Sequence, residues 1–216
     1  MISICNVTRN RNVNLEKCWR TWLFADEIVI IDYGSDVSVK IDHPKIKVYR
    51  YESDKFSKTK GLNMVIGLAQ GDIIIQADSD YYFNREFKES DIQNGEFITG
   101  KDLEHNGNRD IVALTGFCMF WKNDWCQVNG YNERLIYYAY DDDDFYFRME
   151  KIGLKHKKIN PSDITHLTHS DKERLIEFGI SGNPERMLYR SRRKNMSISV
   201  NNLWSIKDVR SSYENI

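Results

Sequence analysis

The stretch of sequence that decides the fold is IIIQADSD, residues 73–80. Its first part is apolar or nearly neutral, rich in β-branched side chains and preceded by Gly71-Asp72, which is the pattern of a buried strand. The strand ends at Asp78 and Asp80, and acids at the carboxyl end of a buried strand lie where open α/β sheets bind ligands. Two carboxylates on alternate residues suit a hard divalent cation shared with a phosphate. The stretch therefore indicates a site for a metal and a nucleotide.

The segments that precede this stretch alternate between strand-like and helix-like patterns. Strands are expected at residues 2–7, 27–32 and 46–51, with a helix between the first two and a second helix over about 58–70 that has Gly71 at its end. This β-α-β-β-α-β order predicts an α/β fold with a mostly parallel central sheet flanked by helices and joined by right-handed crossovers.

The second half of the chain has weaker patterns. A short helix is expected around 123–128, a longer one after the acidic run at 141–144, and a strand around 155–159. Gly116 interrupts the apolar run 111–121, and a glycine in such a run is expected to mark a close approach of backbone or ligand.

Three strand ends are expected to meet in one crevice. They are the polar turn Thr8–Arg11, the acid Asp32 and the pair of acids at Asp78 and Asp80. The carboxyl ends of parallel strands share one edge of the sheet. Arg9 and Arg11 at that edge would be placed to contact a diphosphate through their guanidinium groups.

The four adjacent aspartates Asp141–Asp144 stand at a predicted helix N-terminus. Acids there accept hydrogen bonds from free N–H groups and oppose the helix dipole, so capping is one explanation. One or two acids would be enough for capping, whereas crowded carboxylates repel one another and raise at least one pKa. A carboxylate with a raised pKa is suited to act as a general base towards a hydroxyl, and the crowding favours that role.

Two further features have alternative interpretations. His169 alone is more often a surface or core histidine, but an imidazole beside two aspartates shifts the expected ion towards manganese. The basic cluster Arg190–Lys194 is either a solvated helix face or a lid that covers a phosphate.

Composition limits the classes of protein. A chain of 216 residues with 41% hydrophobic residues can bury a core as one domain, and two small domains are also possible. A formal net charge of −1 argues against general nucleic-acid binding. Four cysteines without a CxxC pair indicate reduced thiols. No leader pattern or apolar stretch of about 18–20 residues is visible, so we expect a cytoplasmic protein without a membrane span.

The motifs together resemble the GT-A glycosyltransferases, both the inverting family-2-like enzymes and the β-1,4-galactosyltransferases. The resemblance covers nearly the whole chain. It is carried by VTRNR at 7–11, FSKTKGLN at 56–63, the DxD motif ADSD at 77–80, DDDDFYFR at 141–148 and THSDK at 168–172. Short length and an initial strand also resemble the small glycosyltransferase domain encoded by a chlorella virus, which would place the chain in host cytoplasm.

The resemblance implies an inverting, metal-dependent glycosyltransferase that moves a sugar from a nucleoside diphosphate, expected to be UDP, to a glycan hydroxyl. It implies Mn²⁺ or Mg²⁺ held by Asp80 and His169 with help from Asp78. Asp142 would be the catalytic base and Asp141 would help to hold the acceptor. The implied donor-binding residues are Thr8, Arg9, Arg11, Asp32, Lys58, Lys60, Asp78 and Ser79.

The same resemblance implies one GT-A domain over 1–216. Residues up to about 95 would bind the nucleotide, about 96–180 would form the acceptor half, and 181–216 would close over the donor. The Trp-Gly-Trp-Gly-Gly run of the galactosyltransferases is replaced by residues 137–140, YYAY, and the first acid is Asp141 instead of glutamate. A galactose donor therefore does not carry over.

Two other functions remain open at this stage. A sugar-1-phosphate nucleotidyltransferase would carry a glycine-rich loop after its first strand, and Thr8–Arg11 lacks glycine. A carbohydrate- or nucleotide-binding module without turnover is opposed by the intact acidic run at Asp141–Asp144.

Overall fold

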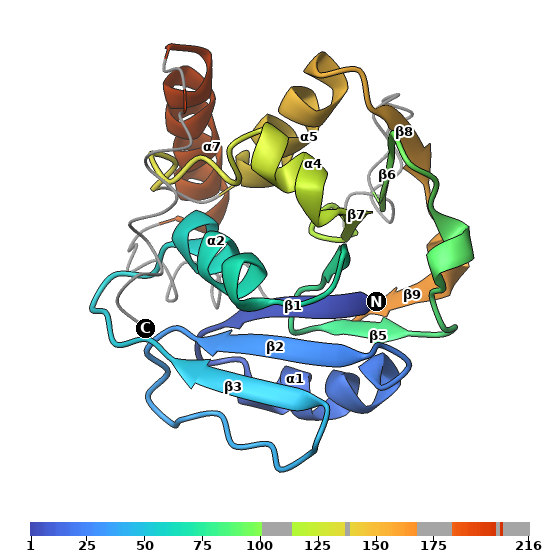
Figure 1. Cartoon of the computed structure of the whole chain (residues 1–216). Helices are drawn as coiled ribbons and strands as arrows, with labels where there is room; N and C mark the ends of the chain where they lie inside the picture. Colours follow the sequence, from blue (N-terminus) through green and yellow to red (C-terminus); the bar gives the residue numbers. More distant parts are fainter. Residues whose placement is uncertain (101–113, 137–138, 168–182, 202–203, 205–216) are drawn as a thin grey trace.

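A seven-stranded sheet forms the centre of the molecule (Figure 1). The computed structural model describes residues 1–100, 114–136, 139–167, 183–201 and 204. In spatial order the strands of this sheet are β3 (Ile46–Arg50), β2 (Glu27–Asp32), β1 (Ile2–Thr8), β4 (Ile73–Gln76), β7 (Cys118–Trp121), β6 (Glu96–Thr99) and β8 (Lys155–Lys158). A second sheet pairs β5 (Tyr81–Phe83) with β9 (Ile164–His166).

The first half of the sheet confirms the predicted β-α-β-β-α-β order. Strand β1 runs parallel to both β2 and β4, and β2 runs parallel to β3. Strand β7 then pairs antiparallel with β4 and with β6, and β6 runs parallel to β8. The antiparallel β7 allows the chain of the second half to return across the sheet next to the strand that carries the DxD motif.

Helices cover both faces of the sheet (Figure 1). They are α1 (Asn12–Cys18), continued by a 3₁₀ turn at Trp19–Trp22, α2 (Lys58–Leu68), α4 (Lys122–Gln127), α5 (Asp141–Lys151) and α7 (Pro184–Asn201); short 3₁₀ turns also occur at Glu89–Asp91 and Pro161–Asp163. No described helix is long and apolar enough to cross a membrane.

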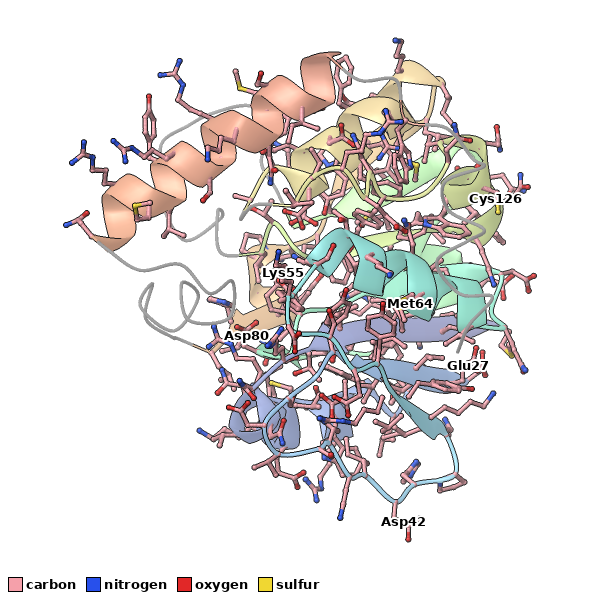
Figure 2. The ribbon with its side chains drawn as sticks, turned by 90° about the vertical axis from the view of Figure 1, so that its left-hand side faces the viewer. Glu27, Asp42, Lys55, Met64, Asp80 and Cys126 are labelled. Carbon is pink, nitrogen blue, oxygen red and sulfur yellow. The ribbon has the colours of Figure 1, made fainter. Side chains whose placement is uncertain are left out.

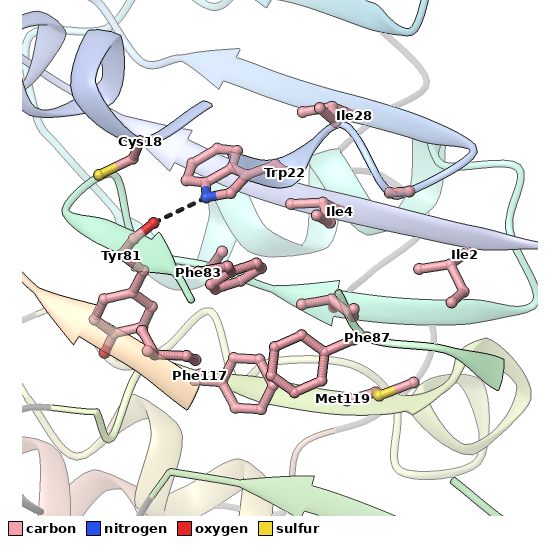
Figure 3. Close-up of a cluster of buried hydrophobic side chains, with 14 of the residues drawn as sticks. Ile2, Ile4, Cys18, Trp22, Ile28, Tyr81, Phe83, Phe87, Phe117 and Met119 are labelled. Atoms are coloured by element: carbon pink, nitrogen blue, oxygen red, sulfur yellow. Dashed lines mark hydrogen bonds between the residues drawn. The ribbon is translucent and has the colours of Figure 1, made fainter. Parts of the chain in front are cut away.

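Alternate side chains of the central strands enter two separate cores. Ile28 and Ile30 of β2 pack with Trp22 on one face, where the Trp22 indole N–H donates to the Tyr81 carbonyl at 2.8 Å (Figure 3). Val29 and Ile31 enter the other core together with buried residues of α2, α4 and α5. All six residues of β2 are buried, as expected for a strand covered on both faces.

Gly71 is needed for a close approach to β1 and does not cap a helix. Helix α2 ends at Leu68, because Ala69 has extended backbone angles (φ −63°, ψ 141°). The Gly71 N–H donates to the Ser3 hydroxyl at 2.7 Å. A Cβ atom at Gly71 would lie 2.7 Å from the Ser3 backbone nitrogen and 2.9 Å from the Met1 carbonyl oxygen. The predicted helix end at residue 70 was therefore two residues too late.

Replacing Gly71 by alanine is expected to lower the free energy of unfolding by about 1–3 kcal/mol, because backbone atoms of β1 must move to admit a methyl group. Urea denaturation measures this change. Gln70→Ala is the matched control, since the Gln70 side chain is exposed and the substitution is expected to stay within about 0.5 kcal/mol of the parent. Equal stability of the Gly71 and Gln70 variants would contradict the close-approach interpretation.

Candidate active site

Asn6 on β1 holds the turn that carries the DxD motif. Its side-chain amide donates to the Ala77 carbonyl at 2.8 Å and lies 3.2 Å from the Ser79 hydroxyl. Asn6 is fully buried and Ser79 nearly so. Ser79 therefore fixes the turn to β1, while the carboxylates of Asp78 and Asp80 on either side of it project from the end of β4.

Lys58, the first residue of α2, lies among three carboxylates. Its ammonium nitrogen is 3.4 Å from Asp78 and 3.5 Å from each of Asp141 and Asp142. Burial by itself would lower the Lys58 pKa, but these three acids raise that pKa well above its ordinary value, so the side chain stays charged. One lysine thus brings the DxD acid of β4 together with the first two acids of α5.

The four aspartates of the acidic run divide into two pairs with different surroundings. Asp141 and Asp142 face Lys58 as described. Asp143 pairs with Arg192 of α7 at 3.3 Å, and Asp144 pairs with Arg148 one turn along α5 at 2.8 Å. The Ser199 hydroxyl also donates to Asp144. Ion pairs with arginines therefore account for the last two acids, and the first two remain candidates for chemistry.

Asp142 is held from two sides. Besides Lys58, the Gln76 side-chain amide donates to the Asp142 Oδ1 atom at 3.2 Å, and Gln76 in turn accepts a hydrogen bond from the Tyr131 hydroxyl. Burial raises the Asp142 pKa to about 7; the Lys58 charge lowers it, Asp141 and Asp78 raise it, and the Gln76 hydrogen bond lowers it. A carboxylate with a pKa near neutrality is matched to proton transfer from a hydroxyl.

The turn before α5 has an unusual backbone. Ala139 and Tyr140 both have positive φ angles, 64° and 75°. Residues with a Cβ atom rarely adopt this left-handed conformation, and each costs roughly 1–2 kcal/mol. The buried Asn195 of α7 donates to the Ala139 carbonyl at 2.7 Å and so holds the turn. The start of α5 is therefore positioned by α7 as well as by Lys58.

Asp80 lies next to a histidine that received no role from the sequence. The His166 Nε2 atom is 3.6 Å from the Asp80 Oδ2 atom, because β9 pairs with β5 and sets His166 opposite Tyr81. The predicted ligand His169 lies outside the described residues. Among the described residues no group of three or more metal-ligating side chains gathers. One carboxylate and one imidazole nevertheless form a donor set that fits a manganese-type ion.

Gly116 leaves the space that the Asp78 side chain occupies. A Cβ atom at Gly116 would lie 2.2 Å from Asp78 Oδ2. The Gly116 N–H donates to the Tyr81 hydroxyl at 3.1 Å. The glycine therefore marks a close approach, as expected, but the group that it approaches is the Asp78 side chain of the DxD motif and not a backbone or a ligand.

The predicted donor-binding residues of β1 and α2 lie at the same edge of the sheet. The Thr8 hydroxyl is buried and has no hydrogen-bond partner among the described residues. The Arg9 guanidinium lies 3.4 Å from the carbonyls of Ser53 and Asp54. Arg11 stands half-buried just before α1. Their contact with a donor stays a prediction.

Two other predicted donor-binding residues have partners within the protein. The Lys60 ammonium donates to the Tyr51 hydroxyl at 2.8 Å. Asp32 accepts from the backbone N–H groups of Ser35 and Val39, each at 3.0 Å, and from Arg50 at 2.7 Å. These contacts give Asp32 a structural role in the turn after β2, and a further role with the donor stays a prediction.

Comparisons with known proteins agree with this arrangement. Residues 107–172 match the family model described as the N-terminal domain of galactosyltransferase. A comparison of the sequence with curated proteins finds no match.

Solved structures with similar folds are glycosyltransferases. A mutant of Drosophila β1,4-galactosyltransferase 7 in complex with manganese, UDP-Gal and xylobiose has a TM-score of 0.59 and 14% identity, covering 87% of this chain and 78% of that one. S. aureus TarS with UDP-GlcNAc has a TM-score of 0.60 and 14% identity, covering 98% and 70%. The Pyrobaculum calidifontis mannosyltransferase PcManGT with GDP-Man and Mn²⁺ has a TM-score of 0.57 and 12% identity, covering 98% and 73%.

The chain therefore has the GT-A fold of these glycosyltransferases. Within that class, the matched segment contains β7, α4, α5 and the acidic run, so the second half of the chain is similar to the galactosyltransferases in particular.

The hydrogen bond from Gln76 provides a direct test of the Asp142 environment. Gln76→Leu removes a donor to the charged carboxylate, so the Asp142 pKa is expected to rise above about 7. NMR titration of ¹³C-labelled aspartate carboxyls measures the shift.

Gln127→Leu is the matched control, because Gln127 makes the equivalent amide hydrogen bond to Asp124 on α4 at 3.2 Å. It is expected to leave the Asp142 titration unchanged. An Asp142 pKa that is the same in the Gln76 variant and in the parent would show that the hydrogen bond does not tune this carboxyl.

Proposed function

We propose that the chain transfers a sugar from a nucleoside diphosphate donor, UDP-linked, to a hydroxyl of a glycan acceptor, with inversion at the anomeric carbon. The observation that carries the proposal is the placement of Lys58 within 3.5 Å of Asp78, Asp141 and Asp142. The DxD side, where a donor diphosphate would lie, thereby adjoins the acids that would receive the acceptor. The two reacting groups would meet in one place, as a direct displacement requires.

On the donor side, Asp80 and His166 are the described residues that would hold a divalent cation, with His169 and Asp78 as the further predicted ligands. A Mn²⁺ or Mg²⁺ ion bound there would supply charge neutralisation for the diphosphate leaving group. The Lys58 ammonium supplies a second positive charge towards the same leaving group from the N-terminus of α2.

On the acceptor side, Asp142 accepts the proton of the attacking hydroxyl while Asp141 holds the acceptor. The acceptor oxygen bonds to the anomeric carbon as the bond from that carbon to the diphosphate oxygen breaks, and the proton ends on the Asp142 carboxylate. Because the hydroxyl attacks from the side opposite to the leaving group, the configuration inverts. Burial and a pKa of about 7 support Asp142 as the base.

The similar structures support a nucleotide-sugar donor but differ in its identity. They are complexes with UDP-Gal, UDP-GlcNAc and GDP-Man, and two of them contain manganese. One also contains xylobiose, a glycan, together with the donor. We therefore propose a UDP-sugar and a glycan acceptor without choosing the sugar. We also propose that one domain spans 1–216, with 181–216 closing over the donor, and that the protein is cytoplasmic.

The other two functions are less well supported. The turn after β1, Thr8–Arg11, has no glycine of the kind that a nucleotidyltransferase uses around its phosphates. A binding module without turnover would not require a buried carboxylate held by both Lys58 and Gln76.

Asp142→Asn is expected to lower the rate of sugar transfer by about 10²–10⁴-fold, because the amide cannot take up the hydroxyl proton. Donor binding should persist. The assay follows release of the nucleoside diphosphate from a panel of nucleotide sugars with MnCl₂ and glycan acceptors. Asp143→Asn is the matched control, since Asp143 pairs with Arg192 and has no proposed part in proton transfer.

The same assay across pH gives a second readout. Only the ionised base accepts a proton, so the rate in the parent is expected to rise as pH passes about 7 and to level off above it. Transfer by Asp142→Asn at the parent rate would assign the base to another residue, and absence of binding and release with every donor would remove the transferase proposal.

Asp80→Asn is expected to abolish Mn²⁺-dependent binding of UDP, and His166→Ala is expected to weaken it by more than about tenfold, because each removes one proposed ligand. Isothermal titration calorimetry measures both. His43→Ala is the matched control, since His43 lies against Trp19, with the ring centroids 5.9 Å apart, and has no proposed part in the metal site. Unchanged affinity in the His166 variant would remove this residue from the metal site.

A further inference from the structure

Helix α7 has one face buried against the molecule and one face exposed. Ser191 and Asn195 are buried, and the contacts of Asn195, Arg192 and Ser199 with residues 139–144 attach the helix beside the start of α5. In Figures 1 and 2 the helix runs along the outside of the molecule, and in Figure 2 side chains with nitrogen atoms point from it away from the body. The contacts with residues 139–144 therefore explain the buried face of α7, whereas no contact among the described residues explains its exposed face.

The exposed face is strongly basic. Residues at helical spacing on it are Arg186, Tyr189, Arg190, Arg193 and Met196, all of them exposed. We call this set the outer face of α7. Among the described residues, no carboxylate forms an ion pair with Arg186, Arg190 or Arg193, whereas Arg192 at the edge of the helix pairs with Asp143.

The charge of α7 is opposite in sign to the charge of the rest of the chain. Five basic residues and one acidic residue give the helix a formal charge of +4. The whole chain carries −1, so the remaining residues carry −5. A charge separation of this kind orients a protein on an anionic surface, with the helix towards that surface.

The arginines of the outer face surround two exposed apolar side chains. Tyr189 is 62% exposed and Met196 is 47% exposed. The Arg193 guanidinium carbon lies 5.9 Å from the Tyr189 ring centroid. A basic stripe along one helix also fits a nucleic acid, but the chain has a net charge of −1 and no general basic excess. Arginines that flank a tyrosine and a methionine on one helix face are typical of helices that lie in a lipid headgroup layer.

We propose that the outer face of α7 binds the surface of a bilayer containing anionic phospholipids. The arginines contact lipid phosphates, and Tyr189 and Met196 enter the headgroup layer. The acids Asp141 and Asp142 would then lie about one helix diameter, roughly 10 Å, from the membrane surface. If the proposed transferase activity holds, this placement suits an acceptor that is carried by the membrane.

Vesicle sedimentation with the purified full chain tests the proposal. The chain is expected to sediment with vesicles of phosphatidylcholine and phosphatidylglycerol, to dissociate as salt is raised, and to stay in solution with phosphatidylcholine alone. The triple substitution R186E, R190E and R193E is expected to weaken sedimentation at least about a hundredfold, because each basic residue near an anionic surface contributes roughly fivefold. Tyr189→Ser is expected to weaken it as well.

The matched control reverses three exposed lysines elsewhere, K40E, K88E and K151E, and is expected to bind the anionic vesicles like the parent, apart from the small effect of net charge. Circular dichroism and UDP binding show whether each variant is folded. Four results would each overturn the proposal. Two concern the variants: equal loss of binding in both triple variants, or unchanged binding by Tyr189→Ser. The other two concern the ligand: no binding to anionic vesicles, or stronger binding to a DNA or RNA duplex than to vesicles. Because sedimentation does not require turnover, its failure leaves the proposed transferase activity standing, and the reverse also holds.

Discussion

The ion pairs of Lys58 with three carboxylates are the interaction on which the site depends. Asp141 and Asp142 are largely withdrawn from water, whereas Asp78 is half-buried. An unpaired buried charge costs several kcal/mol. Lys58 is fixed at the start of α2, where Ser57 caps the helix by accepting from the Lys60 N–H. The positive end of the helix and the ammonium group therefore act in the same place. The end of β4 and the start of α5 can approach each other only because this positive charge lies between them.

Strand β4 connects the two halves of the chain. Its last residue, Gln76, reaches Asp142, and the following turn carries Asp78 and Asp80. Its neighbour β1 leads into the turn Thr8–Arg11, and its other neighbour β7 leads to α4 and α5. Displacement of β4 would thus disturb Asp78, Asp80 and Asp142 together, which ties the candidate site to a fully buried strand.

The periodicity of the sequence predicted the order of the strands and helices. It did not predict contacts between side chains that are far apart in the chain. Apolar alternation and helical spacing predicted the β-α-β-β-α-β order. The crowding predicted a raised pKa somewhere in Asp141–Asp144, and only the family resemblance singled out Asp141 and Asp142. Nothing in the sequence marked Gln76, a neutral amide inside an apolar strand, as the partner of a carboxylate 66 residues away. His166 joined Asp80 through β5 and β9, which have three residues each and are too short for a periodic signal.

The left-handed turn at Ala139 and Tyr140 places two strained residues directly before α5. Each of these residues costs about 1–2 kcal/mol in this conformation, and a hydrogen bond from Asn195 of α7 to the Ala139 carbonyl holds the turn. A displacement of α7 would therefore be transmitted through this hydrogen bond to the turn that precedes Asp141 and Asp142. Helix α7 and the first two aspartates of α5 are therefore coupled, and the rigidity of that coupling determines how precisely Asp141 and Asp142 are positioned.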